Sequence, residues 1–346
     1  MTDLSTQPVR GRAGYAGFRS VIKAVATGPR GSRDLTFDEA REAGAALLAG
    51  DVTPAQAGAF LIGLRVKGEA ADELAGLAQA LRDRATALRA PDGGGPLVVS
   101  AGAFDGIAEA PPLSLAAGAC ATAAGARVVV ACGSRIGPKH GVTAADVLGA
   151  LGGPARPGPE ESAALLARAG MTVVHAGESL PGWEGLAEVR NEVGLRGPVH
   201  SAEKLVDWFG ARRFVVGHTH GGYAPRLLGA LERLGADHAV ALRGVEGSDV
   251  LRPGRPVAAT LAGPVELPER LGLILRGDPD PELAGGLTRA VLAGDEHGAA
   301  RRAVVLSSAV RLLAAGVATD PAEGVRRSEA ALADGRAAAV LDALVG

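Results

Sequence analysis

The 346-residue chain has few cysteines, few aromatic side chains and no excess of either charge. Its two cysteines, Cys120 and Cys132, lie among small and apolar residues, which argues against a disulfide framework or a zinc site. A formal net charge of -2 lacks the basic excess of a nucleic-acid binder. No apolar run approaches a membrane span, and residues 1–12 lack the apolar core of a signal peptide. We therefore expect a cytoplasmic protein that binds neither membranes nor nucleic acid.

Residues 16–88 carry helix signals in succession and no strand signal. Thr36 followed by Glu39 forms a capping box, and Thr53 before Pro54 opens the next helix. These signals predict a compact all-α region at the start of the chain.

A glycine-rich stretch at residues 92–96 separates this region from an alternating strand and helix pattern. We predict two domains, a helical one at 1–92 and an α/β one at 93–346, with helices around 159–205 joining the first. The expected fold class is α/β: a small N-terminal all-α domain and a larger domain with a mainly parallel central sheet flanked by helices.

The pattern at the start of the second domain predicts a βαβ unit. It consists of a strand at 97–99, a loop at 100–106, a helix at 113–124, a strand at 127–131 and a loop at 132–142. Parallel strands place both loops at the same edge of the sheet, where open α/β sheets bind ligands. The remaining elements are predicted as strands at 172–174, 213–216 and 238–242, and helices at 159–169, 186–193, 204–208, 223–234, 283–293, 300–315 and 321–344.

Two further residue types are interpreted as structural. A His-x-His spacing can bind metal, but a clear third ligand is lacking for the histidines at positions 175, 200, 218 and 220. Trp183 and Trp208 are predicted to lie in the core rather than to stack on a ligand.

Several segments, in order along nearly the whole chain, resemble the anthranilate phosphoribosyltransferase family. They are residues 35–40 (LTFDEA), 50–61 (GDVTPAQAGAFL), 64–69 (LRVKGE) and 188–196 (EVRNEVGLR), with tail matches at 292–294 and 335–337. The resemblance implies transfer of 5-phosphoribosyl from phosphoribosyl pyrophosphate to an aromatic, anthranilate-like acceptor, with release of pyrophosphate. It also implies Mg²⁺ as the cofactor and a homodimer formed through the helical part.

The resemblance implies a phosphate-binding site in the two loops of the βαβ unit. The family's Gly-Thr-Gly-Gly-Asp loop reads AGAFD at 101–105, where Asp105 keeps its register, and its Lys-His-Gly-Asn-Arg segment is also altered. The residues expected to hold phosphoribosyl pyrophosphate are Gly102, Asp105, Gly106, Ser114, Arg135, Lys139 and His140. No catalytic residue is assigned.

The acceptor and metal sites follow from the same resemblance. Arg190 matches a family arginine that pairs with the acceptor's carboxylate, as a guanidinium fork favours. Asp249 matches one carboxylate of the family's magnesium pair, whereas Val250 replaces the other. We therefore expect a weakened magnesium site in which Glu246 is the substitute ligand.

These departures leave two alternatives open. The altered glycine loop and the missing carboxylate are compatible with a non-catalytic relative that binds a ligand or partner without turnover. A nucleoside phosphorylase-type activity is the other, because that enzyme class shares the architecture.

Overall fold

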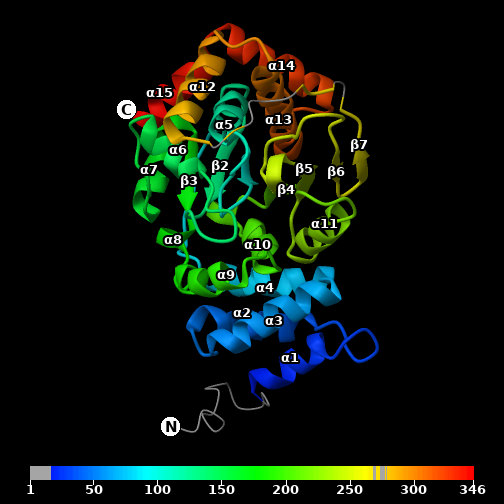
Figure 1. Cartoon of the computed structure of the whole chain (residues 1–346). Coiled ribbons are helices and arrows are strands. Elements are labelled where there is room, and N and C mark those ends of the chain that lie inside the picture. The colour runs from blue at the N-terminus through cyan, green and yellow to red at the C-terminus, as the bar shows by residue number, and fades with distance from the viewer. Residues whose placement is uncertain (1–16, 268–269, 273–276, 278) are drawn as a thin grey trace.

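The computed structural model describes residues 17–267, 270–272, 277 and 279–346. Residues 1–12 and the first position of the helical region predicted at 16–88 therefore lie outside the described residues. The chain begins with a group of helices at one end of the molecule (Figure 1). They are α1 (Phe18–Ala26), α2 (Phe37–Ala49), α3 (Pro54–Lys67) and α4 (Ala71–Arg84). Thr36 and Thr53 cap α2 and α3 with the predicted capping boxes. Helix α2 packs on α4, and α1 packs on α3.

A seven-stranded sheet follows, with strand order β3-β2-β1-β4-β5-β6-β7. Its strands are β1 (Leu97–Ala101), β2 (Arg127–Cys132), β3 (Met171–His175), β4 (Arg213–His218), β5 (His238–Arg243), β6 (Ala258–Thr260) and β7 (Gly263–Val265). Strands β1 to β5 are parallel, and β6 and β7 add an antiparallel edge. The predicted α/β class with a mainly parallel sheet is therefore confirmed.

Helices and short 3₁₀ turns surround the sheet (Figure 1). They are α5 (Ser114–Ala123), α6 (Ala144–Ala150), α7 (Pro159–Ala169), α8 (Ala176–Ser179), η1 (Glu184–Leu186), α9 (Ala187–Val193), α10 (Val199–Ala202), η2 (Glu203–Leu205), η3 (Trp208–Gly210), α11 (Ala224–Arg233), η4 (Val245–Gly247), α12 (Pro281–Ala293), α13 (Ala299–Ala315), α14 (Pro321–Ala333) and α15 (Arg336–Val345). Among the described helices, none combines the length and apolarity that crossing a membrane requires.

The two faces of the sheet belong to two different cores. Alternate strand residues point to opposite faces, so Val98 packs with α5 and α13, whereas Leu97 and Val99 pack with the helices of the N-terminal part. Helices α10 and α11 contact α4, and α9 contacts α3. The predicted core positions of Trp183 and Trp208 are confirmed, since both side chains are buried in the second core.

Two predictions about secondary structure were wrong, and some elements were not predicted. The helix predicted at 321–344 is two helices, because Gly335 adopts a left-handed φ of 77° between them. The helix predicted at 204–208 is replaced by the 3₁₀ turns η2 and η3. The short edge strands β6 and β7 and the helix α6 were not predicted.

The direction in which successive strands are added to the sheet reverses between the parallel strands β1 and β4. From β1 the order runs through β2 to β3 on one side, and from β4 through β5 on the other. The loops that leave the carboxyl ends of β1 and β4 therefore diverge, which opens the crevice where α/β sheets bind ligands.

Candidate active site

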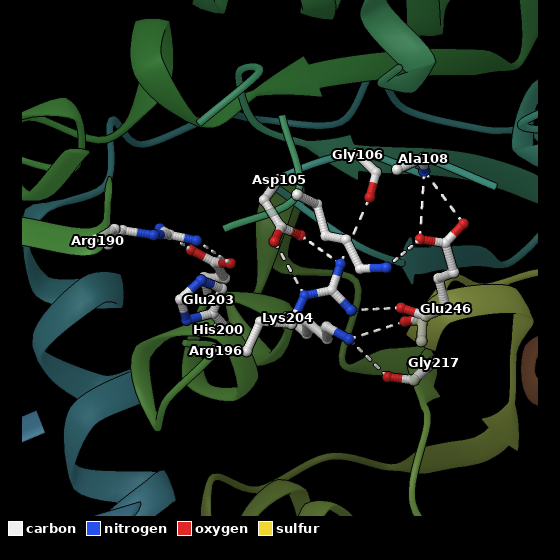
Figure 2. A network of polar contacts seen from close by, with 12 residues as sticks. Asp105, Gly106, Ala108, Arg190, Arg196, His200, Glu203, Lys204, Gly217 and Glu246 are labelled. Atoms are coloured by element: carbon white, nitrogen blue, oxygen red, sulfur yellow. Dashed lines mark hydrogen bonds and ion pairs between the residues drawn. The ribbon is translucent and has the colours of Figure 1, made fainter. Parts of the chain in front are cut away.

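The loop after β1 is held by one arginine. Asp105 is buried, and Arg196 donates from Nε to its Oδ2 at 2.9 Å and from Nη2 to its Oδ1 at 2.6 Å (Figure 2). Arg196 also donates from Nη1 to the backbone carbonyl of Glu246 at 2.5 Å. This planar fork connects the β1 loop to the segment after β5, which fixes both at the same edge of the sheet.

Glu246 lies at the centre of a second set of contacts. Its backbone has a left-handed φ of 50°, which turns the carboxylate toward the β1 loop. The carboxylate accepts hydrogen bonds from the backbone amides of Ala108 at 3.1 Å and Glu109 at 2.7 Å, and Lys139 Nζ lies 2.6 Å from it. Lys139, from the loop after β2, is thus brought to the crevice.

The ends of β4 and β5 lie unusually close to the segment 245–249. A Cβ atom on Gly217 would meet the carbonyl oxygen of Ser248 at 1.8 Å, and one on Gly244 would meet it at 1.7 Å, so both positions require glycine. Lys204 closes this corner from η2, donating to the carbonyls of Gly217 at 2.7 Å and Gly247 at 2.9 Å. Burial lowers the pKa of Lys204 to about 8.

Two adjoining cavities open at this edge. The first, which we call the histidine cavity, has a volume of about 270 Å³ and is lined by residues that include Arg65, Glu69, Phe104, Asp105, Arg196, His200, Ser201, Glu203, Lys204, His218, Tyr223 and Arg226. The second, which we call the lysine cavity, has a volume of about 770 Å³ and is lined by residues that include Glu109, Lys139, Leu195, Val245, Glu246 and Arg252. Arg65, Arg196, Thr219 and His220 line both.

Five of the predicted site residues lie in or beside these cavities. Asp105 lines the histidine cavity, and Lys139 and Glu246 line the lysine cavity. Gly106, with a φ of 80°, lets the β1 loop lie against the next loop, since a Cβ there would meet Gly141 O at 2.2 Å. A Cβ at Gly102 would lie 3.0 Å from the amide nitrogen of Asp249. The two glycines therefore permit close backbone approach.

Ser114 and Asp249 lie together beneath the crevice. Asp249 is buried and accepts hydrogen bonds from Ser114 Oγ at 2.5 Å and Ser100 Oγ at 2.7 Å. Arg311 of α13, whose side chain is fully buried, donates to Asp249 Oδ2 at 2.6 Å. The chain itself therefore engages both oxygens of this carboxylate.

Arg135, His140 and Arg190 line neither of these two cavities. Arg135 is paired with Asp146 at 3.1 Å, and His140 Nδ1 lies 3.3 Å from the backbone carbonyl of Arg135. Arg190 is buried and donates from Nη1 and Nη2 to the two carboxylate oxygens of Glu203 at 2.8 and 3.2 Å (Figure 2). Its guanidinium also stacks on the Trp183 ring. Arg190 thereby orients Glu203, which does line the histidine cavity.

Among the crevice residues that were not assigned a role from sequence are Arg196, His200, Lys204 and His218. Arg196 ends the quoted segment 188–196, so the same resemblance contained a signal for it. His200 and Lys204 carry no spacing that distinguishes them from structural residues, and the His-x-His spacing of His218 and His220 was interpreted as structural. The role of these residues depends on where β4 meets the segment 199–205.

The buried His218 of the histidine cavity should make the stability of the protein depend on pH. Burial lowers the pKa of His218 to about 4, whereas an unfolded histidine titrates near 6.5. The unfolded state therefore binds more protons between these values, and stability falls as pH drops from about 6.5 to 4. We expect His218→Gln to reduce this loss, measured as the free energy of unfolding in urea at pH 7 and pH 4.5. The exposed His238→Gln is the control, and an unchanged pH slope in His218→Gln would contradict the prediction.

Comparison with known proteins gives the family. Residues 19–85 match the model of the glycosyl transferase family helical bundle domain, and residues 108–338 match that of the family's a/b domain. The anthranilate phosphoribosyltransferase of Rubrobacter xylanophilus is 34% identical over 94% of this chain and 96% of its own length.

Solved structures agree with this match. The anthranilate phosphoribosyltransferase of Thermus thermophilus superposes with a TM-score of 0.82 at 30% identity, over 95% of this chain and 98% of the other. The Saccharomyces cerevisiae enzyme, solved in complex with PRPP and Mg, has the same fold, with a TM-score of 0.77 at 17% identity over 95% and 96% of the two chains. On the evidence of the matched domains, the relative's identity over nearly full length and the shared fold, the chain belongs to the anthranilate phosphoribosyltransferase family.

Proposed function

We propose that this chain transfers 5-phosphoribosyl from phosphoribosyl pyrophosphate to anthranilate and releases pyrophosphate. The observation that carries the proposal is the pair of adjoining cavities at the β1/β4 switch point, joined through Arg196, in a chain of this family. A large cavity with several cations suits a substrate with several phosphates. A smaller neighbour suits one substituted aromatic ring.

In this reaction the amine nitrogen bonds to the ribosyl C1 as the bond from C1 to the pyrophosphate oxygen breaks. The leaving pyrophosphate takes the electron pair, and the amine loses a proton. Charge builds up on the pyrophosphate and on the sugar, so fixed cations and correct positioning supply most of the rate. Lys139, Arg252 and Arg196 line the lysine cavity and would meet that charge.

Magnesium is the metal of the proposed reaction, and the Saccharomyces cerevisiae enzyme was solved with it. No group of three or more acidic, histidine or cysteine side chains that could hold a metal occurs within the described ranges. Mg²⁺ typically uses one or two carboxylates together with substrate phosphates, and Glu246 at the lysine cavity fits that role. Asp249 fits it less well, because it lines neither cavity and its partner Arg311 is fully buried, whereas Glu246 and its partner Lys139 both line the lysine cavity. When bound, the ion would offset negative charge on the pyrophosphate.

Of the predicted site residues, Asp105, Lys139 and Glu246 are the ones on which the proposal mainly depends. Gly102 and Gly106 would hold the β1 loop close enough for its backbone to approach a phosphate. For Ser114, Arg135, His140 and Arg190 a direct substrate contact stays a prediction. In the present arrangement Arg190 would act on the acceptor through Glu203.

Lys139→Met is expected to raise the KM for phosphoribosyl pyrophosphate about tenfold and to change the KM for anthranilate little, because one charge-assisted contact to a phosphate is lost. The loss of anthranilate fluorescence in the presence of Mg²⁺ measures both constants. Lys23→Met, on the exposed face of α1, is the control. Equal changes in the two KM values would place Lys139 outside the phosphate site.

Three measurements separate the alternatives. Release of pyrophosphate with anthranilate supports the transferase. Phosphate-dependent release of the base from thymidine or uridine would indicate a nucleoside phosphorylase instead. Calorimetric binding of phosphoribosyl pyrophosphate without any turnover would indicate a non-catalytic relative.

We further propose a homodimer and a cytoplasmic location, as the family resemblance implies. Sedimentation equilibrium at micromolar concentration tests the dimer.

A further inference from the structure

Two histidines of the histidine cavity have a ring nitrogen without a partner. His200 lies on α10 and His218 ends β4, and their side chains are only 8% and 5% exposed. Nε2 of each ring is buried and makes no hydrogen bond, although both residues line the cavity. Buried polar atoms are nearly always paired, so two unpaired nitrogens in one cavity indicate a missing hydrogen-bonding group.

The hydrogen bond that Nδ1 makes in each ring determines whether Nε2 is a hydrogen-bond donor or acceptor. Nδ1 of His200 lies 3.0 Å from the amide nitrogen of Gly197, which donates, so the ring proton of a neutral His200 is on Nε2. Nδ1 of His218 lies 3.1 Å from the carbonyl oxygen of His220, which only accepts, so its proton is on Nδ1. A ligand that enters the cavity and reaches these buried atoms would therefore meet a donor at His200 Nε2 and an acceptor at His218 Nε2.

The surroundings keep both rings neutral. Burial lowers the pKa of His200 well below its ordinary value, and Arg190, Arg196 and Lys204 add to this effect. Burial also lowers the pKa of His218, and the positive charges of Lys204 and Arg243 contribute, which outweighs the opposite effect of the hydrogen bond to the His220 carbonyl. A neutral pair with one donor and one acceptor fits a ligand that carries both a hydrogen-bond donor and an acceptor.

A metal ion does not fit this pair. His200 Nε2 carries a proton in the neutral ring, and a ligating nitrogen has to be free of one. No third histidine, cysteine or carboxylate completes a metal site in the part of the chain that the structure describes.

We propose that His218 Nε2 accepts a hydrogen of the acceptor's aromatic amine and that His200 Nε2 donates to its carboxylate. This inference rests on the proposed function and assigns its acceptor contacts to two residues of this chain. When the bond from nitrogen to C1 forms and the bond from C1 to the pyrophosphate oxygen breaks, the amine proton passes to His218 Nε2. The N-alkylated arylammonium is a strong acid, so even a weakly basic imidazole suffices, and solvent then takes the proton.

Ligands that lack one group test the two contacts separately. Calorimetry measures the binding of anthranilate, of benzoate, which lacks the amine, and of aniline, which lacks the carboxylate. We expect His218→Leu to weaken anthranilate and aniline binding by about five- to tenfold and to leave benzoate binding unchanged. His200→Leu should weaken anthranilate and benzoate binding similarly and leave aniline binding unchanged. Equal effects on all three ligands, or none, would overturn the proposal.

Turnover separates proton transfer from positioning. His218→Gln places an amide oxygen near the position of Nε2, so it should bind anthranilate like the wild type while kcat falls about 100-fold, because an amide cannot take the proton. A kcat within threefold of the wild type would exclude His218 as the proton acceptor. His238→Gln on the exposed start of β5 is the matched control.

Failure of the proposed function and failure of the histidine contacts give different experimental results. A wild-type protein that releases no pyrophosphate from phosphoribosyl pyrophosphate and anthranilate would contradict the proposed function. The calorimetric comparison uses free protein without phosphoribosyl pyrophosphate, so it tests the histidine contacts even in that case. If His218→Leu does not fold, His218→Gln still decides the assignment through kcat.

Discussion

Arg311→Met is expected to lower the free energy of unfolding by about 3–5 kcal/mol, because it leaves a buried carboxylate without its countercharge. Arg311 is fully buried on α13, and its Nη2 donates to Asp249 Oδ2 at 2.6 Å. Among the described residues, the hydroxyls of Ser100 and Ser114 would then remain as the hydrogen-bond partners of the Asp249 carboxylate. Methionine fills a similar volume, so the expected loss comes from charge rather than from a cavity.

Unfolding in guanidinium chloride, followed through the fluorescence of the two buried tryptophans, measures this loss. The double variant Arg311→Met/Asp249→Asn should regain part of it, because no net charge stays buried. Arg327→Met is the control, since its ion pair with Glu323 lies at the surface and contributes at most about 1 kcal/mol. A change below 1 kcal/mol in Arg311→Met would show that Asp249 does not depend on this partner.

Arg196→Lys is expected to lower kcat/KM about 100-fold for both substrates, even though the positive charge is kept. A lysine cannot reproduce the two parallel contacts to Asp105 together with the contact to the carbonyl of Glu246. The β1 loop and the segment after β5 would shift relative to each other. The two cavities share Arg196, so the shift would affect both substrate sites.

Steady-state kinetics with each substrate varied in turn tests this expectation. Arg212→Lys is the matched control, because its pair with Asp237 at 3.0 Å is exposed and lies away from the crevice. An unchanged circular dichroism spectrum and melting temperature would show that Arg196→Lys is folded. A kcat/KM within threefold of the wild type would show that Arg196 does not position the two substrate sites.

Local signals were sufficient for most of the fold. The capping boxes at Thr36 and Thr53 and the apolar run at 97–99 act over a few residues, and the structure has helices and a strand there. Helix α6 was missed although Thr143 and Asp146 form the same kind of capping box. Strands β6 and β7 have three residues each and exist because β5 offers an edge, so no local pattern specifies them.

The candidate site was harder to predict because its contacts span long stretches of sequence. The resemblance marked Asp105, but its partner Arg196 is distant along the chain, and only the folded sheet brings them together. Asp249 was expected at a metal site from its family position, whereas the sequence gives no sign that Arg311 of α13 reaches it. The protonation pattern of His200 and His218 depends on the backbone groups that their Nδ1 atoms meet.

The two glycines that face the Ser248 carbonyl have a consequence for engineering a different acceptor range. Any side chain at Gly217 or Gly244 would collide with that oxygen, so libraries that randomise these positions would return mostly misfolded clones. Ser201 and Thr219 line the same cavity without that restriction. Libraries that seek activity on new aromatic amines should therefore vary Ser201 and Thr219 first and keep Gly217 and Gly244 unchanged.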